Sequence, residues 1–385
     1  MKKTNVIMAI TLFAIAGCGG NRPSTDDVIT VDVTASYPKK ELILQDFMDV
    51  EYIPLETTDE FLCQGLLQDI GKDIIIVRNR VQDGNIFIFD RNGKAIKKIN
   101  RKGQGSEEYV TIIRIVLDEE NGEMFVCDSY TRKMLVYDLD GNFKRSFKHK
   151  EDARYETVYS FDRENLICHD NSTRNKGQSF MTVSKQDGSI TGDIQIPFEE
   201  KKFPWLSARD EASGMNYALA PAGNHPIVPY LDSWILVEPS ADTLYRYFPD
   251  RTMTPFIAKT PPVRSLDPEV WLFAGVVTDR YYFMESVKKE GDAIRQTGLP
   301  TASLVYDKQE KAIFRYDVYN DDYSTKESVY MMSRPVNNEI AAWPLEAHQL
   351  VESYEKGKLK GRLKEIAAGL DEDSNPVIML MKHRK

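Results

Sequence analysis

The sequence lacks the residue patterns that would point directly to a chemical reaction. No two of its five histidines share the spacing of a metal-ligating pair, and no Gly-x-Ser-x-Gly nucleophile elbow is present. The glycines at 103 and 105 neither open a helix nor precede the lysine of a P-loop. We therefore assign no catalytic residue, no metal ligand and no cofactor from the sequence.

Cysteine is also scarce, and acidic residues outnumber basic ones by 59 to 50. Beyond the cysteine at position 18, which is discussed below, the chain has only Cys63, Cys127 and Cys168. An odd number cannot form a complete disulfide framework, and apolar surroundings favour buried thiols at 127 and 168, although one pair remains open. The formal net charge of −9 argues against nucleic acid as a partner.

The N-terminus has the pattern of an export signal. The apolar run from Val6 to Ala16 is too short for a membrane span, which needs about 20 residues. A basic start, an apolar run and a small-residue exit predict a signal peptide over residues 1–17. The exit Ile15-Ala16-Gly17-Cys18 resembles the bacterial lipobox, so we expect acylation of Cys18 and a membrane anchor through lipid.

A tether and a location follow from the same segment. Small and polar residues after Cys18 predict a flexible, lipid-anchored tether over residues 18–40. The protein is then an outer-membrane lipoprotein that faces either the periplasm or the cell surface. The acids Asp26 and Asp27 favour the surface only weakly, because they lie late after the cysteine.

One strand–turn–strand pattern recurs at a fixed interval. The stretches NIFIFDRNGKAIKKI (85–99) and MLVYDLDGNFKRSF (134–147) align on Gly93 and Gly141, which are 48 residues apart. A third copy places Gly188 another 47 residues along the chain. The β-branched and aromatic residues suit strands, and the Asn-Gly and Asp-Gly pairs suit tight hairpin turns. Weaker copies at 242–257 and 303–318 bring the number of predicted hairpins to five.

Further strand-like stretches between the hairpins give about four strands per interval, which is typical of a β-propeller. A sandwich would not repeat at this interval, and a solenoid repeat is usually shorter. A ring must close to hide its sheet edges, and the segments 49–58 and 375–384 can pair to make a sixth blade. Pro54 suits an outer strand there. The sequence therefore predicts an all-β, six-bladed propeller of four-stranded antiparallel blades over residues 41–385, with five or seven blades as alternatives.

One stretch departs from this pattern. Residues of about 345–369 are rich in Glu, Lys, Leu and Ala at helical spacing, interrupted by Gly357 and Gly361. They predict two short helices inserted before the last strand. The insertion either packs on the propeller or binds a partner.

Several stretches carry a family resemblance: VEYIPLETT (50–58), IFIFDRNGKAIKKI (86–99), GQGSEEY (103–109), VYDLDGNF (136–143) and DSNPVIMLMK (373–382). With these stretches the chain resembles the six-bladed β-propeller lipoproteins of Gram-negative gut anaerobes, which are relatives of the NHL-like propellers. Ser106-Glu107 replace the Pro-Gly usual in this family's loop. The resemblance implies six blades and a lipid anchor, and it supplies no catalytic residues.

Candidate ligand-binding residues come from the irregular stretch 203–226, which lengthens the repeat. Long loops on a rigid scaffold often carry function. We single out Trp205, Arg209, Tyr217 and His225 as a possible surface for sugars or peptides; the alternative is that they pack these loops on the ring.

The sequence by itself is compatible with two functions. The first is a non-catalytic binding or interaction module, expected to be a monomer, whose partner is a glycan, a peptide or an envelope protein. The second is a glycoside hydrolase or lyase acting on an extracellular polymer, since propellers host many activities.

Overall fold

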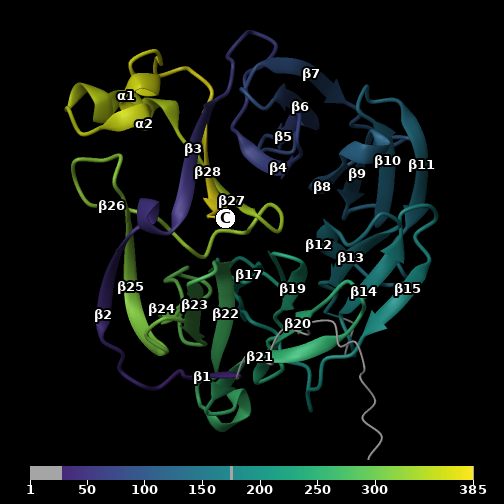
Figure 1. Cartoon of the computed structure of the whole chain (residues 1–385). Coiled ribbons are helices and arrows are strands. Elements are labelled where there is room, and N and C mark those ends of the chain that lie inside the picture. Colours follow the sequence, from purple (N-terminus) through teal and green to yellow (C-terminus); the bar gives the residue numbers. More distant parts are fainter. Residues whose placement is uncertain (1–27, 174–176, 385) are drawn as a thin grey trace, which may run out of the picture.

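Six β-sheets stand around a common axis in the computed structural model (Figure 1). The structure describes residues 28–173 and 177–384. The predicted signal peptide and Cys18 lie outside these residues. The six-bladed propeller predicted from the sequence is confirmed. No helix in the described ranges is long and apolar enough to cross a membrane.

The first three blades are four-stranded antiparallel sheets in which the first strand lies nearest the axis, because β8 contacts both β4 and β12. Blade 1 consists of β4 (Leu66–Ile70), β5 (Ile74–Arg78), β6 (Asn85–Asp90) and β7 (Ala95–Asn100). Blade 2 consists of β8 (Ile112–Asp118), β9 (Glu123–Asp128), β10 (Lys133–Asp138) and β11 (Phe143–Lys148). Blade 3 consists of β12 (Tyr155–Ser160), β13 (Asn165–Asp170), β14 (Phe180–Ser184) and β15 (Ile190–Ile194).

Blades 4 and 5 each gain an outer strand from the N-terminal segment, which runs parallel to the fourth strand. Blade 4 consists of β18 (Ile227–Tyr230), β19 (Ser233–Leu236), β20 (Thr243–Tyr247) and β21 (Met253–Thr260), with β1 (Ile29–Asp32) outside. Blade 5 consists of β22 (Val270–Val277), β23 (Tyr281–Lys288), β24 (Thr301–Asp307) and β25 (Ala312–Asn320), with β2 (Lys39–Ile43) outside and β26 (Glu327–Ser328) at the end of β25. A separate hairpin, β16 (Leu206–Arg209) and β17 (Asn216–Leu219), precedes blade 4.

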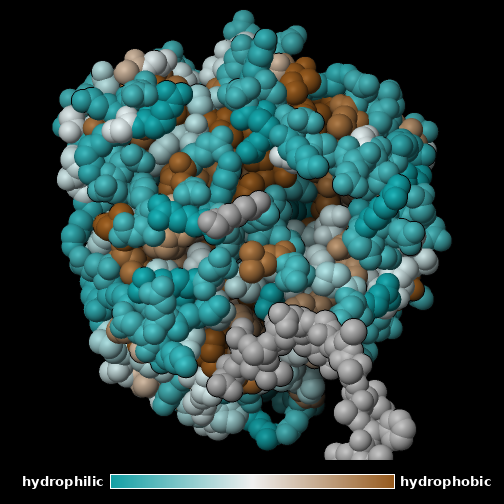
Figure 2. All heavy atoms as spheres, viewed as in Figure 1, coloured by the Kyte–Doolittle hydropathy of each residue, from teal (hydrophilic) through white to brown (hydrophobic). Residues whose placement is uncertain are grey.

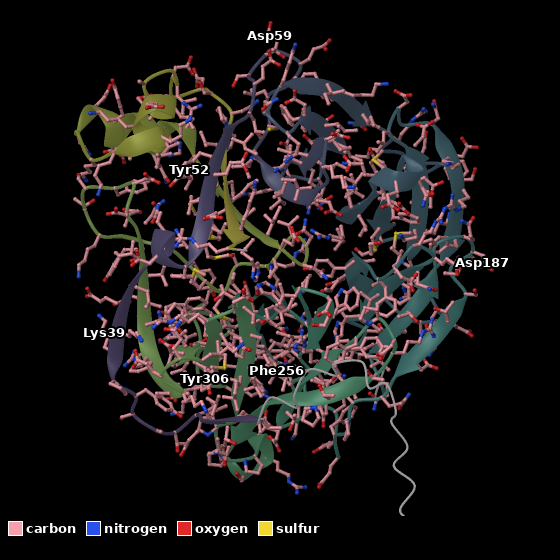
Figure 3. The ribbon with its side chains drawn as sticks, viewed as in Figure 1. Lys39, Tyr52, Asp59, Asp187, Phe256 and Tyr306 are labelled. Atoms are coloured by element: carbon pink, nitrogen blue, oxygen red, sulfur yellow. The ribbon has the colours of Figure 1, made fainter. Side chains whose placement is uncertain are left out.

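Part of the N-terminal segment forms the outer strands β1 and β2. Residues 28–40 fall in the stretch expected as tether, yet β1 and the start of β2 lie within it. Figure 3 shows Lys39 of β2 at the outer rim of the ring, where it forms an ion pair of 2.5 Å with Asp317 of blade 5. The N-terminal segment therefore runs along the outside of two blades before it enters the last one.

The last blade joins the two ends of the chain, as the sequence predicts. β3 (Met48–Pro54) is outermost and pairs with β28 (Val377–His383), which pairs with β27 (Ile340–Leu345). The irregular segment Met331–Val336 holds the position nearest the axis. The Val276 N–H of blade 5 donates to Met331 O at 2.9 Å, and the Val336 N–H donates to Ile340 O at 2.8 Å. Blade 6 thus has three regular strands and an irregular innermost one, which crosses near the ring's centre in Figure 1.

All five predicted hairpins are confirmed as the third and fourth strands of blades 1 to 5. The Asp90 carboxylate closes the first turn by accepting from the Asn92 and Lys94 N–H groups at 2.8 and 2.9 Å, and Gly93 takes a φ of +84° there. A Cβ on Gly93 would lie 2.1 Å from Pro54 O. The repeated glycine is therefore needed both for its backbone angle and for close contact with the preceding blade.

The predicted helical insertion is also confirmed. Helices α1 (Ala347–Glu355) and α2 (Gly361–Ala367) lie between β27 and β28. Their buried side chains Leu350, Leu363 and Ile366 belong to one hydrophobic cluster with Tyr52 of β3 and Met379 of β28. The insertion therefore packs on blade 6.

Candidate functional site

The ring has two faces, and we call the one at which the innermost strands begin the entry face and the other the exit face. Connections between blades and the turns between second and third strands open on the entry face. The long stretch 195–226 joins blade 3 to blade 4 there. Figure 2 shows one face of the ring, with a mostly hydrophilic rim and hydrophobic atoms visible further in.

A groove lies on the entry face between blades 3 and 4. Its volume is about 560 Å³, which is within the usual range for small-molecule sites. Two half-buried aromatic residues, Phe198 and Tyr245, contribute to its wall. The Lys201 ammonium lies 5.3 Å from the centre of the Phe198 ring, and it forms a buried 2.7 Å ion pair with Glu238. Lys201 therefore links the Phe198 ring in the wall of the groove to the buried Glu238 carboxylate.

Charged side chains of both signs surround the groove. Asp242 forms an ion pair with Lys259 at 3.3 Å, and its carboxylate accepts from the Val263 N–H at 2.6 Å. Lys202 bridges Glu200 at 3.3 Å and Glu269 at 3.1 Å. An exposed pair between Arg264 and Glu199 joins two further parts of the lining. The arrangement offers apolar ring surface with hydrogen-bonding groups around it, which suits a neutral or mixed-charge polar ligand.

Of the four residues predicted from the sequence, Trp205 lies beside this groove. Its ring centre is 4.8 Å from that of Phe203. It lines a narrow hollow of about 20 Å³ next to His169, Asn224 and Glu238, which has room for about one water molecule. Burial, with a contribution from the Lys201 charge, lowers the pKa of His169 to about 3, so this histidine is neutral at pH 7.

The other three predicted residues lie elsewhere. Arg209 is exposed on β16 and Tyr217 is half-buried on β17. Because Arg209 pairs with Asn216 rather than with Tyr217, the two side chains point to opposite faces of the hairpin. His225 turns towards the ring axis, where its Nε2 donates to Met332 O at 2.8 Å. Burial lowers the pKa of His225 to about 4. The structure therefore does not gather the four residues into one site.

The main groove residues Phe198, Tyr245 and Asp242 were not predicted from the sequence. Phe198 follows the last strand of blade 3, Tyr245 lies on the third strand of blade 4, and Asp242 lies in the turn before that strand. No local sequence motif therefore joins the three residues. Arg114 was not predicted either, although an arginine inside the apolar strand TIIRIVLD is an unusual residue that signals a special role.

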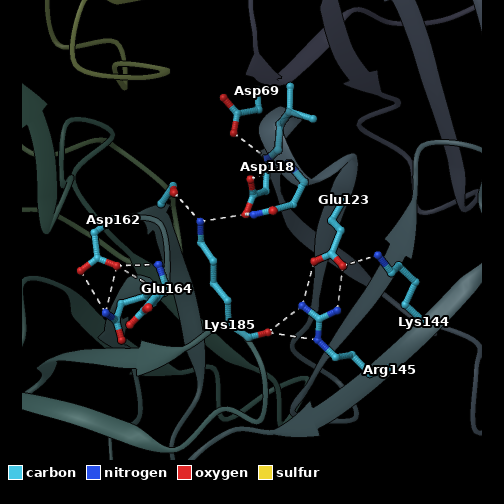
Figure 4. Close-up of polar contacts among 12 residues, drawn as sticks. Asp69, Asp118, Glu123, Lys144, Arg145, Asp162, Glu164 and Lys185 are labelled. Carbon is cyan, nitrogen blue, oxygen red and sulfur yellow. Dashed lines mark hydrogen bonds and ion pairs between the residues drawn. The ribbon is translucent and has the colours of Figure 1, made fainter.

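Blade 3, which borders the groove, is fixed to blade 2 on its other side by polar contacts (Figure 4). Arg145 of β11 donates to both carboxylate oxygens of Glu123 at 2.9 and 2.8 Å and to the Lys185 carbonyl of blade 3. The Lys185 ammonium, in turn, lies 3.0 Å from the Asp118 carboxylate of blade 2. Buried, satisfied contacts of this kind rigidify a scaffold.

A family model described as a domain of unknown function, DUF4934, matches residues 28–382. The chain belongs to the DUF4934 family. This match covers all six blades, so in this member the DUF4934 domain and the propeller are the same unit.

One solved structure supports the fold of this DUF4934 protein. A Bacteroides fragilis protein assigned as exported is 15% identical, with a TM-score of 0.59 over 93% of this chain and 100% of its own. A DUF4221 family member from Bacteroides vulgatus is 10% identical, with a TM-score of 0.42 over 88% of this chain and 98% of its own. No curated protein matches in sequence. At such identities the first likeness supports the fold alone.

Proposed function

We propose that this DUF4934 protein is a non-catalytic binding module of the cell envelope, which takes a glycan or peptide ligand in the groove between blades 3 and 4. The observation that carries the proposal is the groove itself. It has the volume of a ligand site, two half-buried aromatic residues, and a rigid ring behind it. Trp205, beside the groove, extends the aromatic surface.

The lipid anchor is the second part of the proposal. Cys18, in its lipobox-like setting, would carry the acyl chains, and the described chain begins ten residues later on the outside of blade 4. The anchor then attaches at the rim of the ring and leaves the entry face free. Incorporation of labelled fatty acid in the producing bacterium tests this part: it should be lost in Cys18→Ser, and equal labelling of both proteins would contradict it.

Ligand binding is tested with the mature chain on a glycan array and a peptide panel, followed by calorimetry on the ligands that bind. Replacing Tyr245 with alanine removes an aromatic contact, so we expect the affinity to fall roughly tenfold. Tyr130 is 75% exposed on blade 2, outside the groove, and Tyr130→Ala is the matched control.

Unchanged affinity in Tyr245→Ala would place the ligand outside the groove. Turnover of a bound polymer, lost in Tyr245→Ala and retained in Tyr130→Ala, would contradict the non-catalytic role and favour the enzyme.

A further inference from the structure

Three arginine side chains lie close to the ring axis, and none of them lines the groove. Arg114 is on β8, the innermost strand of blade 2, and Arg78 ends β5 of blade 1. Arg334 belongs to the irregular innermost segment of blade 6. Arg114 is 1% exposed and Arg78 is 9% exposed, while Arg334 is half-buried. The sequence brings these residues from three blades, and only the ring places them together.

Their charges repel one another. Burial is the main cause of the lowered pKa of both Arg78 and Arg114, and the charge of Arg334 lowers both further. The pKa of Arg114 falls to about 10, so this buried guanidinium is still cationic at pH 7. A guanidinium that stays charged in a buried position normally has a partner.

Protein acceptors for these groups are almost lacking. Among the residues described, Arg114 and Arg334 make no side-chain hydrogen bond or ion pair, and the Nε and Nη2 atoms of Arg114 are buried without a partner. Arg78 Nη1 donates to Asn79 O at 2.7 Å, and its Nε has no partner. Three buried guanidinium nitrogens, two on Arg114 and one on Arg78, therefore lack a protein acceptor in the described part of the chain.

The nearby carboxylates do not fill this role. Asp69 of β4 lies close enough for Arg114 to act on its pKa, which burial raises. However, Asp69 Oδ1 accepts from the Ile70 N–H and Oδ2 accepts from the Leu117 N–H, both at 2.8 Å. The charge of Asp83 also acts on Arg78, but the Asp83 carboxylate accepts from the side chains of Asn79 and Asn85 at 2.6 and 2.8 Å. Two carboxylates that are engaged in this way cannot balance three guanidinium groups.

We propose that the ring axis is an oxyanion site, at which Arg78, Arg114 and Arg334 bind a carboxylate, sulfate or phosphate group. The planar fork of arginine matches such groups with paired hydrogen bonds. The group belongs either to a free ion or to the acidic end of a larger ligand. This site goes beyond the proposed function, because it does not depend on the groove.

The surroundings hold the arginines in place. The Arg114 guanidinium lies 5.1 Å from the centre of the Tyr159 ring, and the Tyr159 hydroxyl donates to Pro335 O at 2.9 Å, next to Arg334. His225 fixes the same segment through Met332 O. Since His225 is neutral, it adds no charge. The segment with Arg334 is thus tied to blades 3 and 4 as well as to blade 5.

A hollow on the exit face offers a route to the axis. It measures about 490 Å³ and lies where the innermost strands of blades 1 to 3 end. Ile70, Leu117 and Ser160 line it. Ile70 follows Asp69 in the chain, and Ser160 follows Tyr159, so the hollow lies next to the two residues that act on Arg114.

The test is calorimetric titration and thermal unfolding of the mature chain with sodium sulfate, with ionic strength held constant by sodium chloride. We expect saturable binding and a midpoint that rises with the logarithm of sulfate concentration. Arg114→Gln and Arg334→Gln should each weaken sulfate binding at least about tenfold. Arg163 is exposed and lines the same hollow, so Arg163→Gln is the matched control and should bind as the parent does.

Two further readouts separate binding from a structural role. Without sulfate, Arg114→Gln should unfold at a higher temperature than the parent, because it relieves repulsion among buried cations. Arg334→Gln gives a second variant at a half-buried position that has no bond to lose. An equal rise of the midpoint with sulfate in the parent and in both variants would overturn the proposal.

Phosphate, acetate and glucuronate serve as further probes. Tighter binding of glucuronate than of acetate would assign the group to a larger acidic ligand, and equal binding would assign it to a free ion; both results support the site. Failure of all four anions to bind would refute it. Tyr245→Ala should bind sulfate normally, so that failure of the groove and failure of this site are distinguishable.

Discussion

Replacing Gly93 with alanine tests the contact that closes the ring. Gly93 lies in the first hairpin turn, and its neighbour across the seam is β3 of the last blade. Its carbonyl accepts from the Glu56 N–H at 2.8 Å, and a Cβ on it would lie 2.1 Å from Pro54 O. Because this oxygen belongs to the backbone of a paired strand, it cannot rotate away, and the two blades must separate slightly.

The magnitude has two parts. An alanine at a φ of +84° costs about 1–2 kcal/mol, because the left-handed region places Cβ close to the following carbonyl. Overpacking against a fixed neighbour adds about 1–3 kcal/mol. We expect Gly93→Ala to lower the free energy of unfolding by about 2–5 kcal/mol.

Gly122 supplies the control. It has a φ of +61°, and a Cβ there would meet nothing within 4 Å. Gly122→Ala should therefore cost only the backbone part, about 1–2 kcal/mol. Urea unfolding followed by far-UV circular dichroism and tryptophan fluorescence measures both variants. Equal losses in the two variants would refute the idea that the turn glycine is selected by contact with the neighbouring blade.

Two further predictions concern buried charge. The Lys185 ammonium and the Asp118 carboxylate are 5% and 8% exposed, so Lys185→Met should lower the free energy of unfolding by about 3–5 kcal/mol, because it leaves a buried carboxylate without its ion pair. The control Lys97→Met removes an exposed pair with Asp140 and should cost less than about 1 kcal/mol in the same urea titration. Similar losses in the two variants would contradict this prediction. For His169, the folded pKa of about 3 lies below the ordinary value of 6.5, so the unfolded state binds more protons between these values and stability should fall as the pH is lowered from about 6.5 towards 3. His169→Gln should flatten this decline, and an unchanged pH profile would contradict the burial of a neutral imidazole.

The sequence was sufficient for the architecture because the fold is a repeat. Each hairpin encodes its strands through β-branched and aromatic residues, and its turn through a glycine at a constant interval. The helical insertion of α1 and α2 could also be predicted from the sequence, because helical spacing depends only on residues that are near neighbours in the chain. The strand β1 at residues 29–32 was not predicted, and it lies within the stretch expected as tether. A single outer strand is stabilised by the blade with which it pairs, so its own sequence carries little signal.

The candidate sites depended on the tertiary structure. Chain order could suggest that the irregular stretch 203–226 carries function, but only the ring decides that Trp205 lies beside the groove and that His225 contacts the innermost segment of blade 6. Likewise, Arg78, Arg114 and Arg334 come from three blades, and only the closed ring brings them near enough for their charges to act on one another. Sequence periodicity determines which residues form a blade. The closure of the six blades into a ring determines which charged side chains lie near one another in its low-dielectric interior.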